Sequence, residues 1–290
     1  MGKELKISRR DLLKWAGAAG AGALVASRIP WARPPAGPPR AEAHQEGPEH
    51  KRLRRWAMVF DLRKCDGCRG LNLPPQCTQS CIQGHYSPEP MEWIQVFEYK
   101  LEQGGSFFAP VPCQQCENAP CVNVCPVGAT FTTPEGVVMI EQKKLCIGCR
   151  MCMAACPYQR RFFNWGDPIQ PPEAVFAEYN METQVPAIRG TVMKCAFCAH
   201  LAKNGSVPFC VAGCPRKVIW YGDLEEDLAT NTQEVVKLSR FLAQNTAFRL
   251  KEELGTKPRV YYIRGHGQDV GRSPFQTGLL PVKWPWGGGK

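Results

Sequence analysis

Four groups of cysteines constrain this chain more than any other feature of its sequence. All sixteen cysteines fall into these groups, and each group opens with C-x2-C and closes with C-x3-C. The third group is the most regular, because residues 146–157 read C-I-G-C-R-M-C-M-A-A-C-P. Cysteines with this spacing, followed by proline, are typical ligands of cubane [4Fe–4S] clusters. Three thiolates of such a run bind one cluster and the fourth binds a neighbouring one, so one run requires a partner run.

The groups differ mainly in the gap before the third cysteine, which is eight, four, two and eleven residues long in chain order. A C-x2-C turn presents two sulfurs to one face of a cluster, and Gly67 and Gly148 ease this turn in the first and third groups. The third ligand can arrive from a loop, so all four gaps are compatible with ligation. The first group is the least regular, since Ile82 follows its last cysteine where the other groups have proline.

The C-x3-C step spans about one helical turn and directs the third and fourth sulfurs toward different clusters. We therefore predict that each cluster is bound by three cysteines of one group and the last cysteine of a partner group. The second and third groups adjoin and are expected to pair, which leaves the first and fourth groups to pair across the chain. The predicted sites, numbered by the group that supplies three ligands, are site 1 (Cys65, Cys68, Cys77, Cys214), site 2 (Cys113, Cys116, Cys121, Cys156), site 3 (Cys146, Cys149, Cys152, Cys125) and site 4 (Cys195, Cys198, Cys210, Cys81).

A different class of protein is also compatible with this cysteine content. An even number of cysteines in an exported protein fits a disulfide framework, and C-x2-C pairs also bind zinc. A disulfide framework does not favour four repeats of one spacing, whereas cluster ligation requires them. The alternative to an iron–sulfur protein is therefore a zinc-bound or disulfide-stapled binding protein. Iron content and visible absorption distinguish the two, because a folded but colourless and iron-free protein contains no clusters.

Residues 1–43 are predicted to be a twin-arginine signal segment. Residues 8–14 read S-R-R-D-L-L-K, which resembles the twin-arginine export motif. The Gly/Ala-rich stretch 15–26 is shorter than the about 20 apolar residues of a membrane span. Residues 41–43, A-E-A, fit a cleavage site before His44. Twin-arginine export carries folded proteins, so we expect assembly inside the cell and a location in the periplasm or on the outer face of the cytoplasmic membrane. An uncleaved segment acting as an anchor remains the alternative.

Charge and hydropathy limit the kinds of partner. The formal net charge is +10, but eight of the 36 Lys and Arg residues lie in the first 43 residues. The remaining surface is only mildly basic and gives no reason to expect nucleic acid. No stretch beyond the signal segment approaches about 20 apolar residues, so any attachment to a membrane is expected to be peripheral, through another subunit.

The order of strands and cysteine groups predicts an α+β, loop-rich fold of two bacterial-ferredoxin-like dicluster modules, one nested in the other. Expected strands are 56–62, 93–98, 218–221 and 259–263, with a hairpin formed by 129–132 and 136–140. A helix capped by Thr232, with an apolar stripe at Val235, Val236, Leu238, Phe241 and Leu242, is expected near the end. The predicted parts are the signal segment, a linker (44–55), a first module (56–112 and 191–225), a second module (113–190) and a C-terminal helix, strand and extended tail (226–290).

Three motifs carry a resemblance to a known family. They are C-V-N-V-C-P-V-G-A-T at 121–130, the third cysteine group continued to F-N-W at 163–165, and K-C-A-F-C at 194–198 followed by G-C-P at 213–215. The chain resembles the four-cluster iron–sulfur subunits of complex iron–sulfur molybdoenzymes, such as dimethyl sulfoxide, polysulfide and tetrathionate reductases. The likeness spans about residues 56–263. The loop within the first cysteine group departs from the family pattern.

The resemblance implies an electron-transfer subunit and not an enzyme. Four [4Fe–4S] clusters would pass single electrons between a polytopic, quinone-reactive membrane subunit and a catalytic subunit of molybdopterin type. The alternatives are a free periplasmic polyferredoxin and a relay subunit of a non-molybdenum respiratory membrane complex. No catalytic constellation is recognisable in the sequence. His85 and His200 follow cysteine groups, and they are expected either to contact the ligands from outside the cluster or to lie on the surface. Lys194 precedes a ligand and is expected to be a solvated residue or to raise a cluster potential.

Overall fold

The computed structural model describes residues 54–100 and 106–265. The signal segment, nearly all of the linker and the C-terminal tail beyond residue 265 lie outside these ranges. Within the described ranges, no helix is both long enough and apolar enough to cross a membrane.

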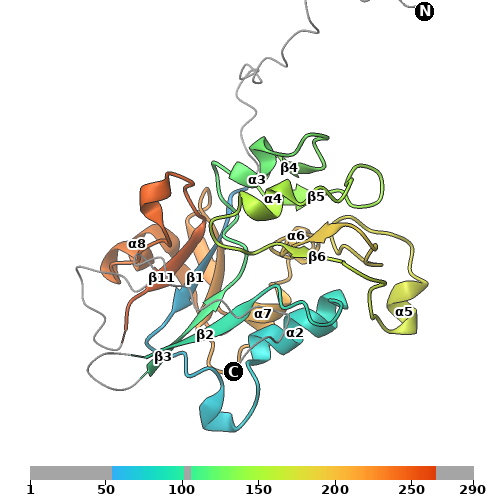
Figure 1. Ribbon diagram of the computed structural model, residues 1–290. Helices are drawn as coiled ribbons and strands as arrows, with labels where there is room; N and C mark the ends of the chain where they lie inside the picture. Colours follow the sequence, from blue (N-terminus) through green and yellow to red (C-terminus); the bar gives the residue numbers. More distant parts are fainter. Residues whose placement is uncertain (1–53, 101–105, 266–290) are drawn as a thin grey trace, which may run out of the picture. The chain divides into compact units, whose positions relative to one another are not determined.

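A five-stranded sheet joins segments from both ends of the described chain (Figure 1). Its order is β10-β9-β8-β1-β11. The central strand β1 pairs antiparallel with β8 and parallel with β11. The strands are β1 (Trp56–Asp61), β8 (Ile219–Asp223), β9 (Leu228–Thr230), β10 (Val235–Lys237) and β11 (Val260–Ile263). The predicted strands near residues 56, 218 and 259 are thus confirmed.

Both faces of the central strand are buried, because every residue of β1 is covered. Side chains alternate between the two faces of a strand. Met58 and Phe60 accordingly join the large core that contains most of the cysteines. Ala57 and Val59 join a smaller cluster on the opposite face, with Trp220 and Leu238. The sheet therefore separates the cysteine-rich part of the molecule from a small cap built by the C-terminal segment.

Three small antiparallel sheets carry the connections between cysteine groups. The expected hairpin between the second and third groups is confirmed, with Thr130 opposite Ile140 and Thr132 opposite Val138. The pairs are β2 (Gln95–Lys100) with β3 (Ser106–Val111), β4 (Thr130–Thr132) with β5 (Val138–Ile140), and β6 (Phe162–Phe163) with β7 (Val192–Met193).

Helices are short throughout the described ranges, and this mixture of small sheets and helices is an α+β fold. Only α2 reaches ten residues. The α-helices are α2 (Gln76–His85), α3 (Pro120–Asn123), α4 (Met151–Ala154), α5 (Pro172–Val175), α6 (Ala199–Lys203), α7 (Phe209–Ala212) and α8 (Leu238–Gln244). Two 3-10 turns, η1 (Arg69–Leu71) and η2 (Glu252–Leu254), complete the set. The loop of the first group thus contains a 3-10 turn and ends at α2.

The predicted start of the C-terminal helix is wrong. Val235 and Val236 lie in β10, and α8 begins only at Leu238. Thr232 caps no helix; it lies with a φ of 77° at the tip of the β9–β10 hairpin. Asn231 closes this tip by accepting hydrogen bonds from two following backbone N–H groups at 3.0 and 2.9 Å. β-Branched valines beside such a turn favour a strand, and pairing with β9 outweighs the helical spacing.

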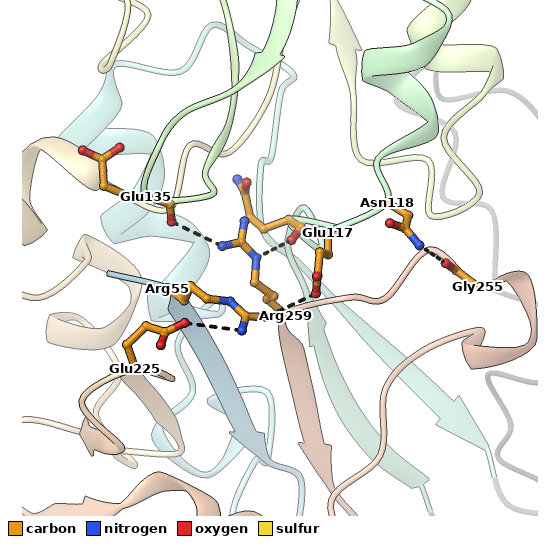
Figure 2. Close-up of polar contacts among 8 residues, drawn as sticks. Arg55, Glu117, Asn118, Glu135, Glu225, Gly255 and Arg259 are labelled. Carbon is orange, nitrogen blue, oxygen red and sulfur yellow. Dashed lines mark hydrogen bonds and ion pairs between the residues drawn. The ribbon is translucent and has the colours of Figure 1, made fainter. Parts of the chain in front are cut away.

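An arginine at the start of β11 fastens the loop of the second cysteine group to the sheet (Figure 2). The Arg259 side chain is 3% exposed. Its Nε donates to the Gln115 carbonyl oxygen at 2.9 Å, and its Nη1 reaches the Glu135 carbonyl oxygen at 3.5 Å. One guanidinium therefore holds both the ligand loop and the turn of the β4–β5 hairpin.

Contacts nearer the surface support the same junction (Figure 2). Asn118 Nδ2 donates to the Gly255 carbonyl oxygen at 3.0 Å. Arg55 forms ion pairs with Glu117 at 3.2 Å and Glu225 at 3.4 Å. These exposed pairs contribute little individually, at most about 1 kcal/mol each. Together with Arg259 they fix the second cysteine group against the sheet.

Candidate iron–sulfur cluster sites

Each cysteine group builds the same local structure. The third cysteine lies in the first turn of a short helix, and the fourth follows one turn later, as the C-x3-C spacing predicts. A helix start suits a cluster ligand because its backbone N–H groups are not used within the helix. The third and fourth cysteines are Cys77 and Cys81 on α2, Cys121 and Cys125 at α3, Cys152 and Cys156 at α4, and Cys210 and Cys214 at α7.

The C-x2-C turns are also alike in all four groups. The residue before the second cysteine has a positive φ in every case, at 63° for Gly67, 46° for Gln115, 72° for Gly148 and 54° for Phe197. Sequence reasoning identified the two glycines and missed the other two, because non-glycine residues rarely adopt this conformation. At those two positions tertiary contacts must therefore stabilise the turn.

Gln115 shows how a non-glycine turn is held. Its side chain is fully buried. Its Nε2 donates to the Cys195 carbonyl oxygen at 2.8 Å, and its Oε1 accepts from the Val138 N–H at 2.8 Å. One amide therefore connects the second cysteine group, the fourth group and strand β5.

Gly148 offers a test of the ligand turn. A Cβ at this position would collide with the Gly190 carbonyl oxygen, and φ is 72°. We expect Gly148→Ala to cost about 3 kcal/mol, from about 1–2 kcal/mol of backbone strain and a similar cost for overpacking. Gly205→Ala is the matched control, because Gly205 has a φ of 73° with nothing near its Cβ position, and we expect a loss of only about 1 kcal/mol. Thermal unfolding of the iron-loaded protein measures both, and equal losses would contradict the steric argument.

The helices bring the cysteine groups together in two pairs. Helix α2 of the first group contacts α7 of the fourth, and α3 of the second contacts α4 of the third (Figure 1). One cavity is lined by the four cysteines of site 1. A second cavity is lined by the four cysteines of site 3. Each cavity thus receives three cysteines from one group and the last from another.

The pKa values of the remaining cysteines indicate which thiols lie near one another. Burial, and after it the neighbouring thiols of Cys113, Cys156 and Cys121, raise the pKa of Cys116 to about 12. These four are the cysteines of site 2. The pKa of Cys210 is also raised by burial, then by Cys198, Cys81 and Cys195, which are the other members of site 4, and last by Cys77 of site 1. Cys113 of site 2 also raises the pKa of Cys195, so these two sites adjoin.

The buried thiols fit a strongly charged cofactor. Burial raises the pKa of both Cys65 and Cys198 to about 12, so at neutral pH these thiols stay protonated unless a metal compensates for the buried charge. Backbone donors also point at the sulfurs. Gln76 N–H lies 3.5 Å from Cys68 Sγ, and Phe197 N–H lies 3.4 Å from Cys195 Sγ. Hydrogen bonds to ligand sulfurs are a feature of iron–sulfur sites.

Cys125 differs from these thiols because its pKa is lowered, and this also suits a ligand of iron. Burial alone would raise its pKa, but the backbone N–H groups of residues 127–130 outweigh this effect and lower the pKa below its usual value. A turn that stabilises the thiolate form is suited to a sulfur that binds iron. This turn joins α3 to the β4–β5 hairpin.

All sixteen cysteines are free thiols in this structure. No disulfide joins any of the sixteen, all of which lie in the described ranges. Within residues 54–100 and 106–265, no three His, Cys, Asp or Glu side chains converge closely enough to hold a single metal ion. A cubane does not require such convergence, because each of its four ligands binds a different iron.

Two buried cations lie beside the ligands. Lys194 is fully buried, not solvated; its Nζ donates to the Cys195 carbonyl oxygen at 2.7 Å and to the Val138 carbonyl oxygen. Arg161 is 4% exposed, and its side chain lowers the pKa of Cys152 against the effect of burial. No sequence pattern indicated Arg161, because it follows the third group at no characteristic spacing.

Site 3 is the most open of the four. Cys149 is exposed, unlike the other fifteen cysteines of the described chain. Large apolar side chains around it are also exposed, namely Val127 at 38%, Ile147 at 64% and Met151 at 51%. An apolar surface around a ligand is typical of a contact region for a partner.

Two family models match the chain. Residues 105–170 match a 4Fe–4S dicluster domain, which covers the second and third cysteine groups. Residues 6–26 match a signal sequence of the twin-arginine translocation pathway. The prediction of twin-arginine export is confirmed, although the segment lies outside the described residues.

Similarity to known proteins extends over most of the chain. A selenate reductase subunit of Mesobacillus selenatarsenatis is 38% identical over 225 residues, which are 72% of this chain and 71% of that protein. The chain belongs to the iron–sulfur subunits of the iron–sulfur molybdoenzyme family. A tetrathionate reductase subunit of Salmonella typhimurium is 33% identical over 294 residues, 98% of either chain. The menaquinone reductase iron–sulfur cluster-binding subunit of Nitratidesulfovibrio vulgaris is 35% identical over 242 residues, 72% of this chain and 88% of its own.

Family membership establishes the general role. This iron–sulfur subunit carries [4Fe–4S] clusters in a ferredoxin-like dicluster fold and transfers electrons within a reductase complex. It is an electron-transfer subunit and not a catalytic one. These statements confirm the predicted family, cofactor type and general function.

Proposed function

We propose that this subunit holds four [4Fe–4S] clusters at sites 1 to 4 and relays single electrons between a quinone-reactive membrane subunit and a catalytic subunit of molybdopterin type. The observation that carries the proposal is the arrangement of the cysteines. Two cavities each gather three cysteines of one group and the last of another. Among the remaining eight, the thiols that raise the pKa of Cys116 and of Cys210 most strongly are the other members of sites 2 and 4 respectively. A [4Fe–4S] cluster supplies a one-electron redox centre when bound.

The four sites belong to two nested modules in this proposal. Residues 56–112 and 191–225 form the outer module with sites 1 and 4, and residues 113–190 form the inner module with sites 2 and 3. Contacts between α2 and α7, and between α3 and α4, support this division. The C-terminal part, 226–290, supplies three strands to the same sheet as β1 and β8, so it braces the outer module.

The protein's own residues position and insulate the clusters. The C-x2-C turns and helix starts place the sulfurs, while the large core excludes water around most of them. Lys194 and Arg161 place positive charge beside ligands, which favours the added electron of a reduced cluster. Sites 2 and 4 adjoin at Cys113 and Cys195, so electrons cross between the modules there.

A fixed partner is favoured over a free polyferredoxin by the surface of site 3. The exposed Cys149 and its apolar surroundings leave this site accessible to solvent unless another protein covers it. One relative is named as a menaquinone reductase subunit and others as reductase subunits, which supports both a quinone link and a catalytic partner for this chain. The assembly is then peripheral to the membrane through its partners, in the periplasm or on the outer face of the cytoplasmic membrane, with no role for nucleic acid.

Purification from membranes tests this function. We expect the native protein to co-purify with a large catalytic subunit and a polytopic membrane subunit, and to contain about sixteen iron atoms per chain, four for each cubane. Electron paramagnetic resonance of the reduced complex should integrate to several spins. An iron-free protein would overturn the proposal. A soluble, partner-free protein with its clusters would instead identify a polyferredoxin, and a complex without molybdenum would identify a non-molybdenum respiratory relay.

A further inference from the structure

One buried histidine lies beside a predicted ligand of site 4 without belonging to any cysteine group. His85 ends helix α2, four residues after Cys81, and is 1% exposed. Its ring lies 4.7 Å from the Trp93 ring, and it meets the rings of Phe209 at 5.3 Å and His200 at 5.4 Å edge-on. Close packing on these sides fixes the orientation of the imidazole.

The fixed ring directs a nitrogen at a sulfur. His85 Nε2 lies 3.2 Å from Cys198 Sγ, within hydrogen-bond distance for sulfur. A cysteine sulfur that binds iron carries no proton, so the hydrogen of this contact must come from the ring. If the neutral ring were protonated at Nδ1 instead, the lone pairs of Nε2 and Sγ would face each other. The Thr183 backbone carbonyl is a second acceptor near the ring. An iron-bound thiolate carries more negative charge than a carbonyl oxygen and is the stronger acceptor, so we assign the proton to Nε2.

We propose that His85 is a positioning residue that donates a hydrogen bond to Cys198 Sγ and thereby raises the reduction potential of the cluster at site 4. Reduction adds negative charge that the ligand sulfurs share. A hydrogen bond to a more negative acceptor is stronger, so the donor stabilises the reduced cluster more than the oxidised one. This inference rests on the proposed function, because it needs a cluster at site 4.

The placement makes the effect specific to one cluster. The donor comes from the first group's helix, while the acceptor belongs to the fourth group, so the contact depends on the packing of the first group's helix α2 against α7 of the fourth group. Backbone donors such as Phe197 N–H also reach sulfurs of this site, but they cannot be removed by substitution. The His85 side chain can be replaced while the backbone contacts stay in place.

The test is an electron paramagnetic resonance redox titration of the cluster-loaded complex with His85→Phe, which retains an aromatic ring without a donor. We expect one midpoint potential to fall so that the equilibrium constant for its one-electron reduction drops about tenfold, which is about 59 mV, while the other clusters keep theirs. His200→Phe is the matched control, since His200 is the neighbouring histidine and packs against the His85 and Phe209 rings, and we expect no shift. An unchanged potential in His85→Phe, or equal shifts in both variants, overturns the proposal.

A second measurement uses the wild-type complex, so it does not depend on whether a variant assembles and binds iron. Pulsed electron paramagnetic resonance on the reduced wild-type complex with ¹⁵N-labelled histidine should show a weak ¹⁵N coupling at one cluster. Absence of this coupling overturns the hydrogen bond, whether or not the phenylalanine variant loads iron. The two levels of failure are separable, because a wild-type complex without cubane signals refutes the proposed function, whereas cubane signals without ¹⁵N coupling refute only the role of His85.

Discussion

Replacing Cys214 with serine is expected to remove the cluster at site 1 and to spare the cluster bound by the rest of its own group. Cys214 belongs to the fourth group by sequence, but its sulfur lines the cavity of Cys65, Cys68 and Cys77. A serine oxygen is a poor replacement for a thiolate on iron, so this site should lose its cluster or part of its iron. Iron analysis and spin quantitation should show a loss of up to about four iron atoms per chain.

A neighbouring substitution provides the decisive comparison. Cys210 lies four residues earlier, on α7, and the thiols that raise its pKa most strongly are Cys198, Cys81 and Cys195, the other members of site 4. We expect Cys210→Ser to abolish a different signal from Cys214→Ser. The spectrum of Cys214→Ser should match that of Cys65→Ser, and the spectrum of Cys210→Ser should match that of Cys195→Ser. If Cys210→Ser and Cys214→Ser lose the same cluster, cross-ligation between groups is wrong.

The C-x3-C spacing was readable from the sequence because it is a local property. Four residues make about one turn wherever the helix lies, so the sequence alone predicted that the third and fourth cysteines lie one helical turn apart. The strands were predictable for a similar reason, since runs such as residues 56–60 are apolar on both faces. The prediction failed where tertiary contacts decide the backbone, as at Val235 and Val236, whose pairing with β9 overrides a helical pattern.

One cause also explains why the sequence did not reveal the other residues that support the sites. Gln115 and Phe197 both adopt a glycine-like conformation. In the case of Gln115, two groups distant in the sequence hold the side chain, the Cys195 carbonyl and the Val138 N–H. Lys194 is adjacent to a ligand in sequence, but only the fold shows that two carbonyl groups surround its ammonium in the interior. Such contacts depend on segments that lie far apart in the sequence, and no spacing rule reports them.

Removal of iron is expected to cost the protein most of its tertiary structure. Three of the four helices that carry ligands are four residues long, far below the length at which an isolated helix is stable in water. Most of the cysteines also belong to the main core, so empty sites would leave buried thiols around voids. Structural metal sites in small domains contribute on the order of 10 kcal/mol, which is comparable with the whole net stability of about 5–15 kcal/mol of a typical protein. Circular dichroism and thermal unfolding before and after anaerobic chelation measure the loss, and reconstitution with iron and sulfide is the control.

The buried thiols add a pH dependence that only the iron-free protein should show. Burial raises the pKa of Cys65 and Cys198 to about 12, above the value near 8.5 expected in an unfolded chain. A raised pKa contributes stability that is present below the unfolded value and is lost as the pH rises toward the folded one. Whatever structure the iron-free protein retains should therefore weaken between about pH 8.5 and 12. Iron-bound sulfurs do not titrate in this range, so the loaded protein should lack this component. An iron-free protein that stays folded and melts at the same temperature as the loaded one would show that the fold does not depend on its clusters.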